Sequence, residues 1–326
     1  MLMARPFSRR HVPLLATAAV CALLYLAGCL AYPRFARPEV LLNLFTDNAF
    51  LGIAAVGMTF VILAGGIDLS VGAVIGCVSI TSALLIERQH LSPGLVAVLM
   101  LSAGAVFGLG MGCLIQFFEL QPFLVTLAGM FFCRGLGLVL SEESQSVTHP
   151  TMQQLAEWSF PAESPASVKV VTLVFLAVLS LAAAGAYWTR FGRNIHALGG
   201  NENSAMLMGL PVASTKVGVY ALSGFCSALA GLVYTLYTSS GNATAATGLE
   251  LDVIAAVVVG GTLLSGGVGY IGGTLLGVLI FGLIQTLLTF QGSLSSWWTR
   301  IVIGGLLLAF ILLQKFIQGW RLGRSK

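Results

Sequence analysis

The feature that most constrains this chain is its series of long apolar stretches. A helix needs ~20 mainly apolar residues to cross a bilayer. About ten stretches come close to that length, at residues 12–31, 46–64, 71–86, 94–117, 121–140, 169–189, 217–239, 250–264, 271–290 and 298–317. The second and third, like the eighth and ninth, could each be one broken unit. The sequence therefore predicts an all-α polytopic membrane protein of about ten transmembrane helices, with one transmembrane domain over residues 1–326.

The charge content excludes other classes of protein. Only 9% of the 326 residues are charged, whereas a soluble domain carries about 25%. The chain has too few charges to cover a water-facing surface, which rules out a soluble enzyme, a nucleic-acid-binding protein and a disordered chain. The six cysteines lie in apolar runs, and no cluster of His or Cys has metal-ligand spacing. We therefore expect no metal site.

The basic residues predict an orientation. If ten spans alternate from a cytoplasmic N-terminus, ten basic residues face the cytoplasm and five face outward, as the positive-inside rule requires. Both termini are then cytoplasmic. The longest polar stretch, residues 141–168, contains four glutamates and no Lys or Arg, so we expect it to be an acidic external loop.

Two glycine-interrupted segments resemble each other. Residues 63–72 read LAGGIDLSVG and residues 264–273 read LSGGVGYIGG, and both separate two apolar stretches. Gly65 and Gly66 in the first, and Gly266 and Gly267 in the second, are expected to break helices. Paired interruptions of this kind indicate a transport site in transporters.

The first break also carries polar side chains. Asp68 and Ser70 are placed to accept N–H bonds from the start of the next helix. The alternative is that they lie near the permeation path, and both interpretations can hold. Farther along, Arg134 lies within a span, where a charge usually faces a partner or a water-filled cavity unless it extends to the interface.

Small residues predict close helix packing. Gly104, Gly108 and Gly112 lie four residues apart and so share one helical face, where the missing side chains let backbones approach. The spans show no clear ladder of aromatic residues that would stack on a sugar.

The polar stretch over residues 190–215 is expected to hold a short helix. Asn201 or Asn203 can cap it, residues 205–208 can form its body, and Gly209 can end it. The helix would display Met206, Leu207 and Met208. A short apolar-faced helix on a basic loop indicates docking onto a cytoplasmic partner, and folding back against the bundle is the alternative.

No phosphate-binding motif of the G-x-x-x-x-G-K-[ST] type occurs, so any ATP must be hydrolysed by another polypeptide. The run GVGYIG at residues 267–272 matches a dinucleotide fingerprint, but no strand precedes it and no acidic residue follows at the required distance. We expect no cofactor in this chain.

Three motifs resemble a known family across nearly the full length: GGIDLSVG at 65–72, RFGRNIHALGGN at 190–201 and GGTLLSGG at 260–267. They are similar to those of the membrane subunits of ATP-binding-cassette importers for pentoses and hexoses, the ribose-permease class. The likeness is greatest to the galactofuranose permeases. Supporting stretches are residues 43–52, which include Asn48, residues 141–144 and residues 293–299.

The resemblance implies a four-part machine in the bacterial inner membrane with a type II importer fold. A second permease subunit, identical or paralogous, completes the pathway; cytoplasmic ATPases bind ATP and Mg²⁺; a periplasmic protein delivers the sugar. The residues and the resemblance together predict two sets of site residues. Those assigned to the substrate pathway are Asn48, Asp68, Ser70 and Arg134, and those assigned to coupling with the ATPase are Arg193, Ala197, Gly199, Asn201, Ala205 and Gly209.

Two alternatives stay open from the residues. One is an ion-coupled or facilitative sugar transporter that works alone. The other is a permease for branched-chain amino acids, since those proteins share much of this pattern. A membrane scaffold is disfavoured, because broken spans give a scaffold no advantage.

Overall fold

The computed structural model describes residues 12–161, 164, 166–292, 297–298, 301–309 and 312, and these residues are mostly helical. The long and medium helices are α1 (Val12–Ala31), α2 (Pro38–Asp47), α3 (Ala49–Leu63), α4 (Val71–Glu87), α5 (Pro93–Phe117), α6 (Pro122–Leu140), α8 (Val170–Trp188), α11 (Val212–Thr238), α12 (Leu249–Val259) and α13 (Ile271–Gln291). Three shorter helices are α7 (Pro150–Glu157), α9 (Arg190–Gly200) and α10 (Glu202–Leu207). Four two-residue strands form two antiparallel pairs: β1 (Gln145–Ser146) with β4 (Ser240–Gly241), and β2 (Ser159–Phe160) with β3 (Val168–Lys169).

Within the described residues, 6 helices are long and apolar enough to cross a membrane: α1, α5, α6, α8, α11 and α13. A seventh candidate is the pair α2 and α3, which is bent by 55° at Asn48. The structure thus confirms an all-α polytopic membrane protein but not the count of about ten. Two expected spans form the shorter helices α4 and α12, with 17 and 11 residues. At 1.5 Å per residue these reach about 26 and 17 Å, less than the ~30 Å hydrocarbon core. Of the expected span at 298–317, the structure describes only residues 298, 301–309 and 312.

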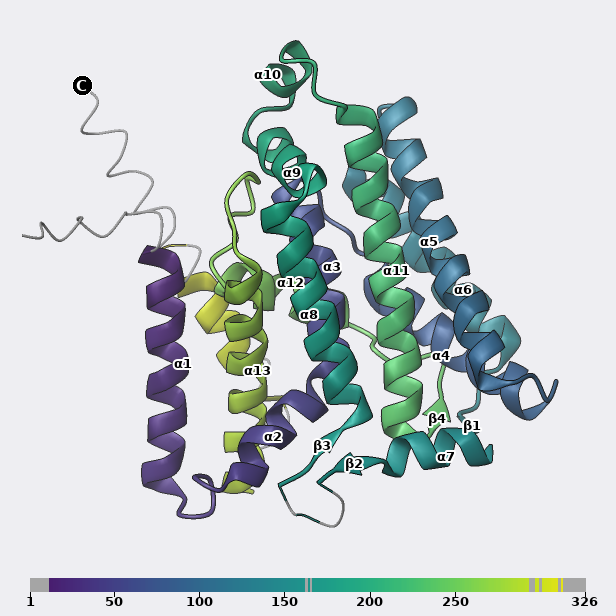
Figure 1. The fold of residues 1–326 in the computed structure, drawn as a ribbon, viewed down its shortest axis with the longest axis vertical. Helices are drawn as coiled ribbons and strands as arrows, with labels where there is room; N and C mark the ends of the chain where they lie inside the picture. The colour runs from purple at the N-terminus through teal and green to yellow at the C-terminus, as the bar shows by residue number, and fades with distance from the viewer. Residues whose placement is uncertain are drawn as a thin grey trace, which may run out of the picture.

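Helix α3 lies at the centre of the bundle (Figure 1). Nearly all its residues are buried, and it contacts α8, α11, α12 and α13. This burial explains its composition, because a helix that is apolar on all sides must be surrounded by other helices. Helix α1, by contrast, packs mainly on α13 at the edge of the bundle.

The glycine stripe of α5 packs against α11, as the spacing predicts. A Cβ on Gly104 would lie 2.6 Å from the carbonyl oxygen of Gly224, and one on Gly112 would lie 2.9 Å from the Cα of Val217. Gly108 approaches the backbone of Tyr220 as closely. The two longest helices therefore pack backbone to backbone along several turns.

The two ends of the bundle differ (Figure 1). One end carries α9 and α10, and the opposite end carries α7 and the four short strands. The polar stretch 141–168 forms β1, α7 and β2 at the α7 end. It is tied to α4 there, since the Glu87 carboxylate accepts hydrogen bonds from the backbone N–H groups of Thr148 and His149 at 2.6 and 3.0 Å.

Candidate functional site: two helix breaks and the short helices that contact them

The first break separates α3 from α4 over residues 64–70. Gly65 has a φ of +86°, a conformation that favours glycine, and the N–H of Gly66 bonds to the carbonyl oxygen of Val61 at 2.9 Å. This arrangement closes the C-terminus of α3 and directs the chain away from the helix axis. Gly65 and Gly66 thus lie where the sequence placed a helix break.

Asp68 connects this break to α11. Its side chain is fully buried. One carboxylate oxygen accepts hydrogen bonds from the Ser70 N–H (2.9 Å) and the Ser70 hydroxyl (2.6 Å), and the other accepts one from the Ser223 hydroxyl (2.7 Å). Ser70 therefore donates to Asp68 and makes no side-chain cap on α4. In this conformation the hydrogen bonds of Asp68 join the first break to α11.

The second break separates α12 from α13 over residues 260–270 and contains three glycines with positive φ, namely Gly261, Gly266 and Gly267. It meets the first break directly, since the N–H of Gly267 donates to the carbonyl oxygen of Leu63 at 2.9 Å. The two segments that resemble each other in sequence are thus neighbours in space.

Helix α9 packs against both breaks at once. A Cβ on Gly199 would overlap the carbonyl oxygen of Leu63 and lie 2.5 Å from the Gly267 nitrogen. One turn earlier, Nδ1 of His196 lies 3.1 Å from the carbonyl oxygen of Gly267. Only glycine fits at position 199, so α9 and the two breaks form one close-packed unit.

Helix α10 follows α9 directly. The Asn201 side chain caps it by accepting the Ser204 N–H at 2.8 Å, and Gly209, with φ +74°, follows its end. Ala205 is buried beneath it. On its other side Met206, Leu207 and Met208 are 61%, 85% and 68% exposed. Helices α9 and α10 lie within the 190–215 loop, where Arg193 is exposed and Ala197 half-buried.

Arg134 lies on α6 and bonds to the chain that connects α11 to α12. Its Nη1 donates to the carbonyl oxygens of Ala243 and Ala245 at 2.8 and 2.9 Å. A cation that satisfies two otherwise free carbonyl groups holds this connection against the bundle. Arg134 therefore has protein partners on the connection between α11 and α12.

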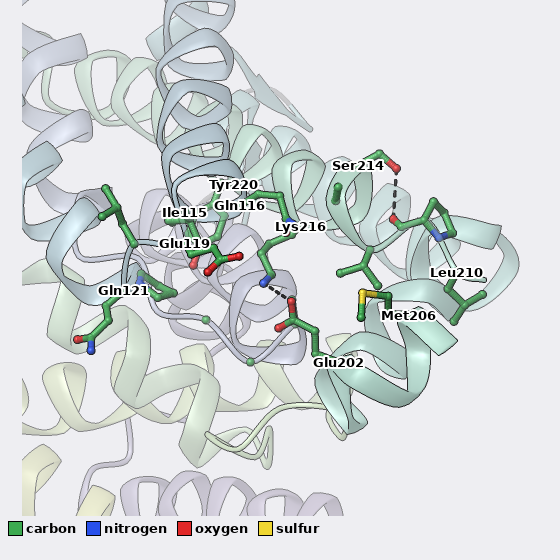
Figure 2. A pocket seen from close by; sticks show the side chains of 18 residues that line it. Ile115, Gln116, Glu119, Gln121, Glu202, Met206, Leu210, Ser214, Lys216 and Tyr220 are labelled. Carbon is green, nitrogen blue, oxygen red and sulfur yellow. Dashed lines mark hydrogen bonds and ion pairs between the residues drawn. The ribbon is translucent and has the colours of Figure 1, made fainter. Parts of the chain in front are cut away.

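Two cavities open at the two ends of the bundle. The α10 cavity, of about 900 Å³, is lined by parts of the first break, the ends of α5 and α6, and the region around α10 (Figure 2). The α2 cavity, of about 880 Å³, lies near the α2–α3 bend, where Asn48 forms part of its wall. Asp68, Ser70 and Arg134 line neither cavity, so the structure does not gather the four pathway candidates at one place.

The wall of the α2 cavity contains an aromatic cluster that sequence reasoning missed. Phe50 of α3 lies 5.3 Å from Tyr234 and 6.4 Å from Tyr237, between ring centroids, and the Tyr237 hydroxyl donates to Asp47 at 2.9 Å. Polar residues complete the wall: Asn48, Thr238, Asp252, Gln285, Thr286 and Thr289. The three-residue spacing of Tyr234 and Tyr237 places both on one face of a helix and could have indicated part of this cluster. Phe50 could not have been added to it, because it lies far away in the sequence.

The chain matches one family model and several known proteins along most of its length. A family model described as "Branched-chain amino acid transport system / permease component" matches residues 40–311. The inner membrane ABC transporter permease protein YjfF of Escherichia coli is 49% identical over 94% of this chain and 93% of its own length. The fructose import permease protein FruG of Bifidobacterium longum is 38% identical over 95% and 92%. The ribose import permease protein RbsC of Bacillus subtilis is 40% identical over 87% of each.

No solved structure matches the chain. The family model nonetheless covers most of the sequence, and these three relatives span nearly the whole of it. The chain therefore belongs to the family of transport-system permease components that this model describes.

Proposed function

We propose that this chain is the membrane-spanning permease subunit of an ATP-driven importer for a monosaccharide in a bacterial inner membrane. Relatives named as ribose and fructose import permeases support the substrate class, and an inner membrane permease supports the location. The family comprises permeases, not enzymes, so the ATPase is a separate subunit. A second permease subunit and a periplasmic binding protein complete the proposed machine.

The observation that carries the proposal is the contact of Gly199 with both helix breaks. A force on α10 can pass through Asn201 into α9 and from there to the Leu63–Gly267 junction. We propose that α10 docks on the ATPase through Met206, Leu207 and Met208, because apolar side chains exposed at the end of a bundle indicate an interface. The proposed coupling residues are Arg193, Ala197, Gly199, Asn201, Ala205 and Gly209.

This role fixes the proposed orientation. The α9–α10 end would face the cytoplasm, and the α7 end, with the 141–168 loop, would face the periplasm. Both chain termini would then be cytoplasmic, in keeping with the positive-inside rule. Their structure lies outside the described residues.

The α2 cavity would admit the sugar from the periplasmic end. Its volume of about 880 Å³ falls within the range of small-molecule sites. Its wall combines aromatic faces with hydroxyl, amide and carboxylate groups that can bond to sugar hydroxyls. Asn48 lies on this route, whereas Asp68, Ser70 and Arg134 would act by holding the segments that must move when it opens.

Galactofuranose is the proposed sugar. It rests on the sequence resemblance, while the named relatives support only a monosaccharide. A branched-chain amino acid is the second candidate because of the family description. The described residues that line the α2 cavity include Asp47 and Asp252 but no Lys or Arg. An amino-acid carboxylate would find no cationic side chain there, which favours a neutral sugar.

Reconstitution in liposomes tests the proposal. The chain would be combined with its ATPase, its partner permease and its binding protein, and uptake of galactofuranose, ribose, fructose and leucine would be compared. The proposal expects ATP-dependent uptake of a sugar and none of leucine. Uptake by the chain alone, or uptake that persists without ATP, would instead support the ion-coupled or facilitative alternative.

A further inference from the structure

An apolar groove on the outer surface of the bundle adjoins the α10 cavity. This α5–α6 groove has a volume of about 700 Å³ and is lined by Phe107, Gly110, Met111, Leu114, Leu120, Leu124, Val125, Ala128, Gly129 and Phe132. Leu120 lines both the groove and the α10 cavity. A cavity with both polar and apolar lining residues at the end of the bundle therefore adjoins an apolar groove that runs along its side.

The groove has the dimensions of an acyl chain site. Its lining runs from Leu114 to Phe107 on α5 and from Leu124 to Phe132 on α6. At 1.5 Å per residue these segments cover about 10 to 12 Å along the helices. One leaflet of the hydrocarbon core is about 15 Å deep. The groove thus extends over most of one leaflet and ends at the α10 end, where lipid headgroups lie.

The α10 cavity offers groups that suit a phosphate. The first residues of α11 line it, and no side chain caps that helix. The N–H of Val212 donates to the carbonyl oxygen of Leu210 at 2.8 Å, which leaves the N–H groups of Ala213 and Ser214 without a partner among the described residues. Lys216 lines the same cavity (Figure 2). Tyr220 is only 2% exposed, and its hydroxyl has no hydrogen-bond partner among the described residues. A buried unpaired hydroxyl is costly unless a ligand completes it.

The charges of the cavity select the headgroup. Lys216 forms an ion pair with Glu202 at 2.6 Å, whereas the exposed Glu119 has no hydrogen-bond partner among the described residues. Two carboxylates against one ammonium leave a net charge of −1 in the lining. A purely anionic headgroup would be repelled, but a headgroup with both a phosphate and a primary ammonium would be complemented.

We propose that the α10 cavity and the α5–α6 groove together bind one phosphatidylethanolamine molecule. Its acyl chain lies along Phe107 and Phe132, and its phosphate lies at the N-terminus of α11 near Tyr220 and Lys216. Its ammonium pairs with Glu119. The lipid would thereby contact the first break through Gly66, which lines the same cavity. This site does not depend on which solute the chain transports.

Matched glycine variants of the purified full-length chain test the groove. A Cβ on Gly110 or on Gly135 meets no atom within 4 Å, and both are exposed, but only Gly110 lines the groove. We expect Gly110→Leu to lower the phosphatidylethanolamine retained per chain roughly tenfold, measured by mass spectrometry of extracted lipid, and Gly135→Leu to leave it unchanged. Equal retention in the two variants overturns the proposal.

Headgroup variants test the polar end. In a titration with palmitoyl-oleoyl phosphatidylethanolamine, Glu119→Gln and Tyr220→Phe should each raise the apparent Kd several-fold, and phosphatidylglycerol with the same acyl chains should bind more weakly to the wild-type chain. A preference for phosphatidylglycerol contradicts the charge argument. A disulfide-linked homodimer formed through Gly110→Cys would show that a second copy of the chain, not a lipid, occupies the groove.

Discussion

Gly199→Ala is the smallest change that tests whether α9 joins the two helix breaks. The added Cβ would overlap the carbonyl oxygen of Leu63 and lie 2.5 Å from the nitrogen of Gly267. Both are backbone atoms, so neither can rotate away as a side chain could. Either α9 moves outward, or the breaks separate and the hydrogen bond between Gly267 and Leu63 is lost.

The expected loss in the free energy of unfolding follows from these two outcomes. Overpacking a close contact costs about 1–3 kcal/mol, and loss of the backbone hydrogen bond adds about 1 kcal/mol. We therefore expect Gly199→Ala to lower the free energy of unfolding by about 1–3 kcal/mol if only α9 moves, and by about 2–4 kcal/mol if the hydrogen bond is also lost. The adjacent variant Gly200→Ala is the control, since its Cβ would meet no atom within 4 Å. A helical alanine is favoured over glycine by up to ~1 kcal/mol, so this control should be neutral or slightly stabilising.

The effect on transport is measured as ATP-dependent uptake in proteoliposomes, and the effect on stability by thermal unfolding of the same preparation. Gly199→Ala should insert into the membrane but lose most of its uptake, whereas Gly200→Ala should keep it. Wild-type uptake and stability in Gly199→Ala would refute the contact and the coupling route built on it.

Three further variants test individual contacts. Ser223→Ala removes a donor to the buried Asp68 carboxylate and should lower the free energy of unfolding by about 2 kcal/mol. The control Ser227→Ala should lose less, because the Ser227 hydroxyl bonds only within its own helix. Equal losses of the two variants in thermal unfolding would contradict this. Arg134→Met should speed amide hydrogen exchange in the chain between α11 and α12. Arg134→Lys should restore part of the protection, because it keeps one cationic donor. Unchanged exchange would show that the arginine does not hold that segment. Tyr237→Phe removes a hydroxyl from the α2 cavity and should raise the KM for sugar uptake several-fold with little change in maximal rate; an unchanged KM would argue against this cavity as the sugar route.

The local features of the site were predictable from the sequence because they depend on short-range chemistry. A double glycine after an apolar run indicates the end of α3, and Asn201 and Asn203 both offer a cap for a short helix, of which the structure uses Asn201. The four-residue glycine spacing on α5 likewise indicates close packing, whichever helix is its partner. Each of these signals involves residues within a few turns of one another.

The contacts between distant segments could not be predicted in this way. Nothing in the sequence shows that Gly267 bonds to Leu63, or that Gly199 fits between them, because close backbone packing leaves no pattern of its own. The aromatic cluster of Phe50 and Tyr237 joins residues far apart in the chain. The structure does not confirm the number of spans for a related reason, since an apolar stretch reports burial but not whether it crosses the bilayer or ends at a break inside the bundle.

The central claim is that α10 is the cytoplasmic contact for a separate ATPase. Ser204 is exposed on α10, and Glu143 is exposed at the opposite end of the bundle, so Ser204→Cys and Glu143→Cys report on the two sides. With a membrane-impermeant maleimide, the account predicts that Glu143→Cys is labelled in intact cells and Ser204→Cys only in inverted vesicles, where added ATPase should protect it. Labelling of Ser204→Cys in intact cells would contradict the account.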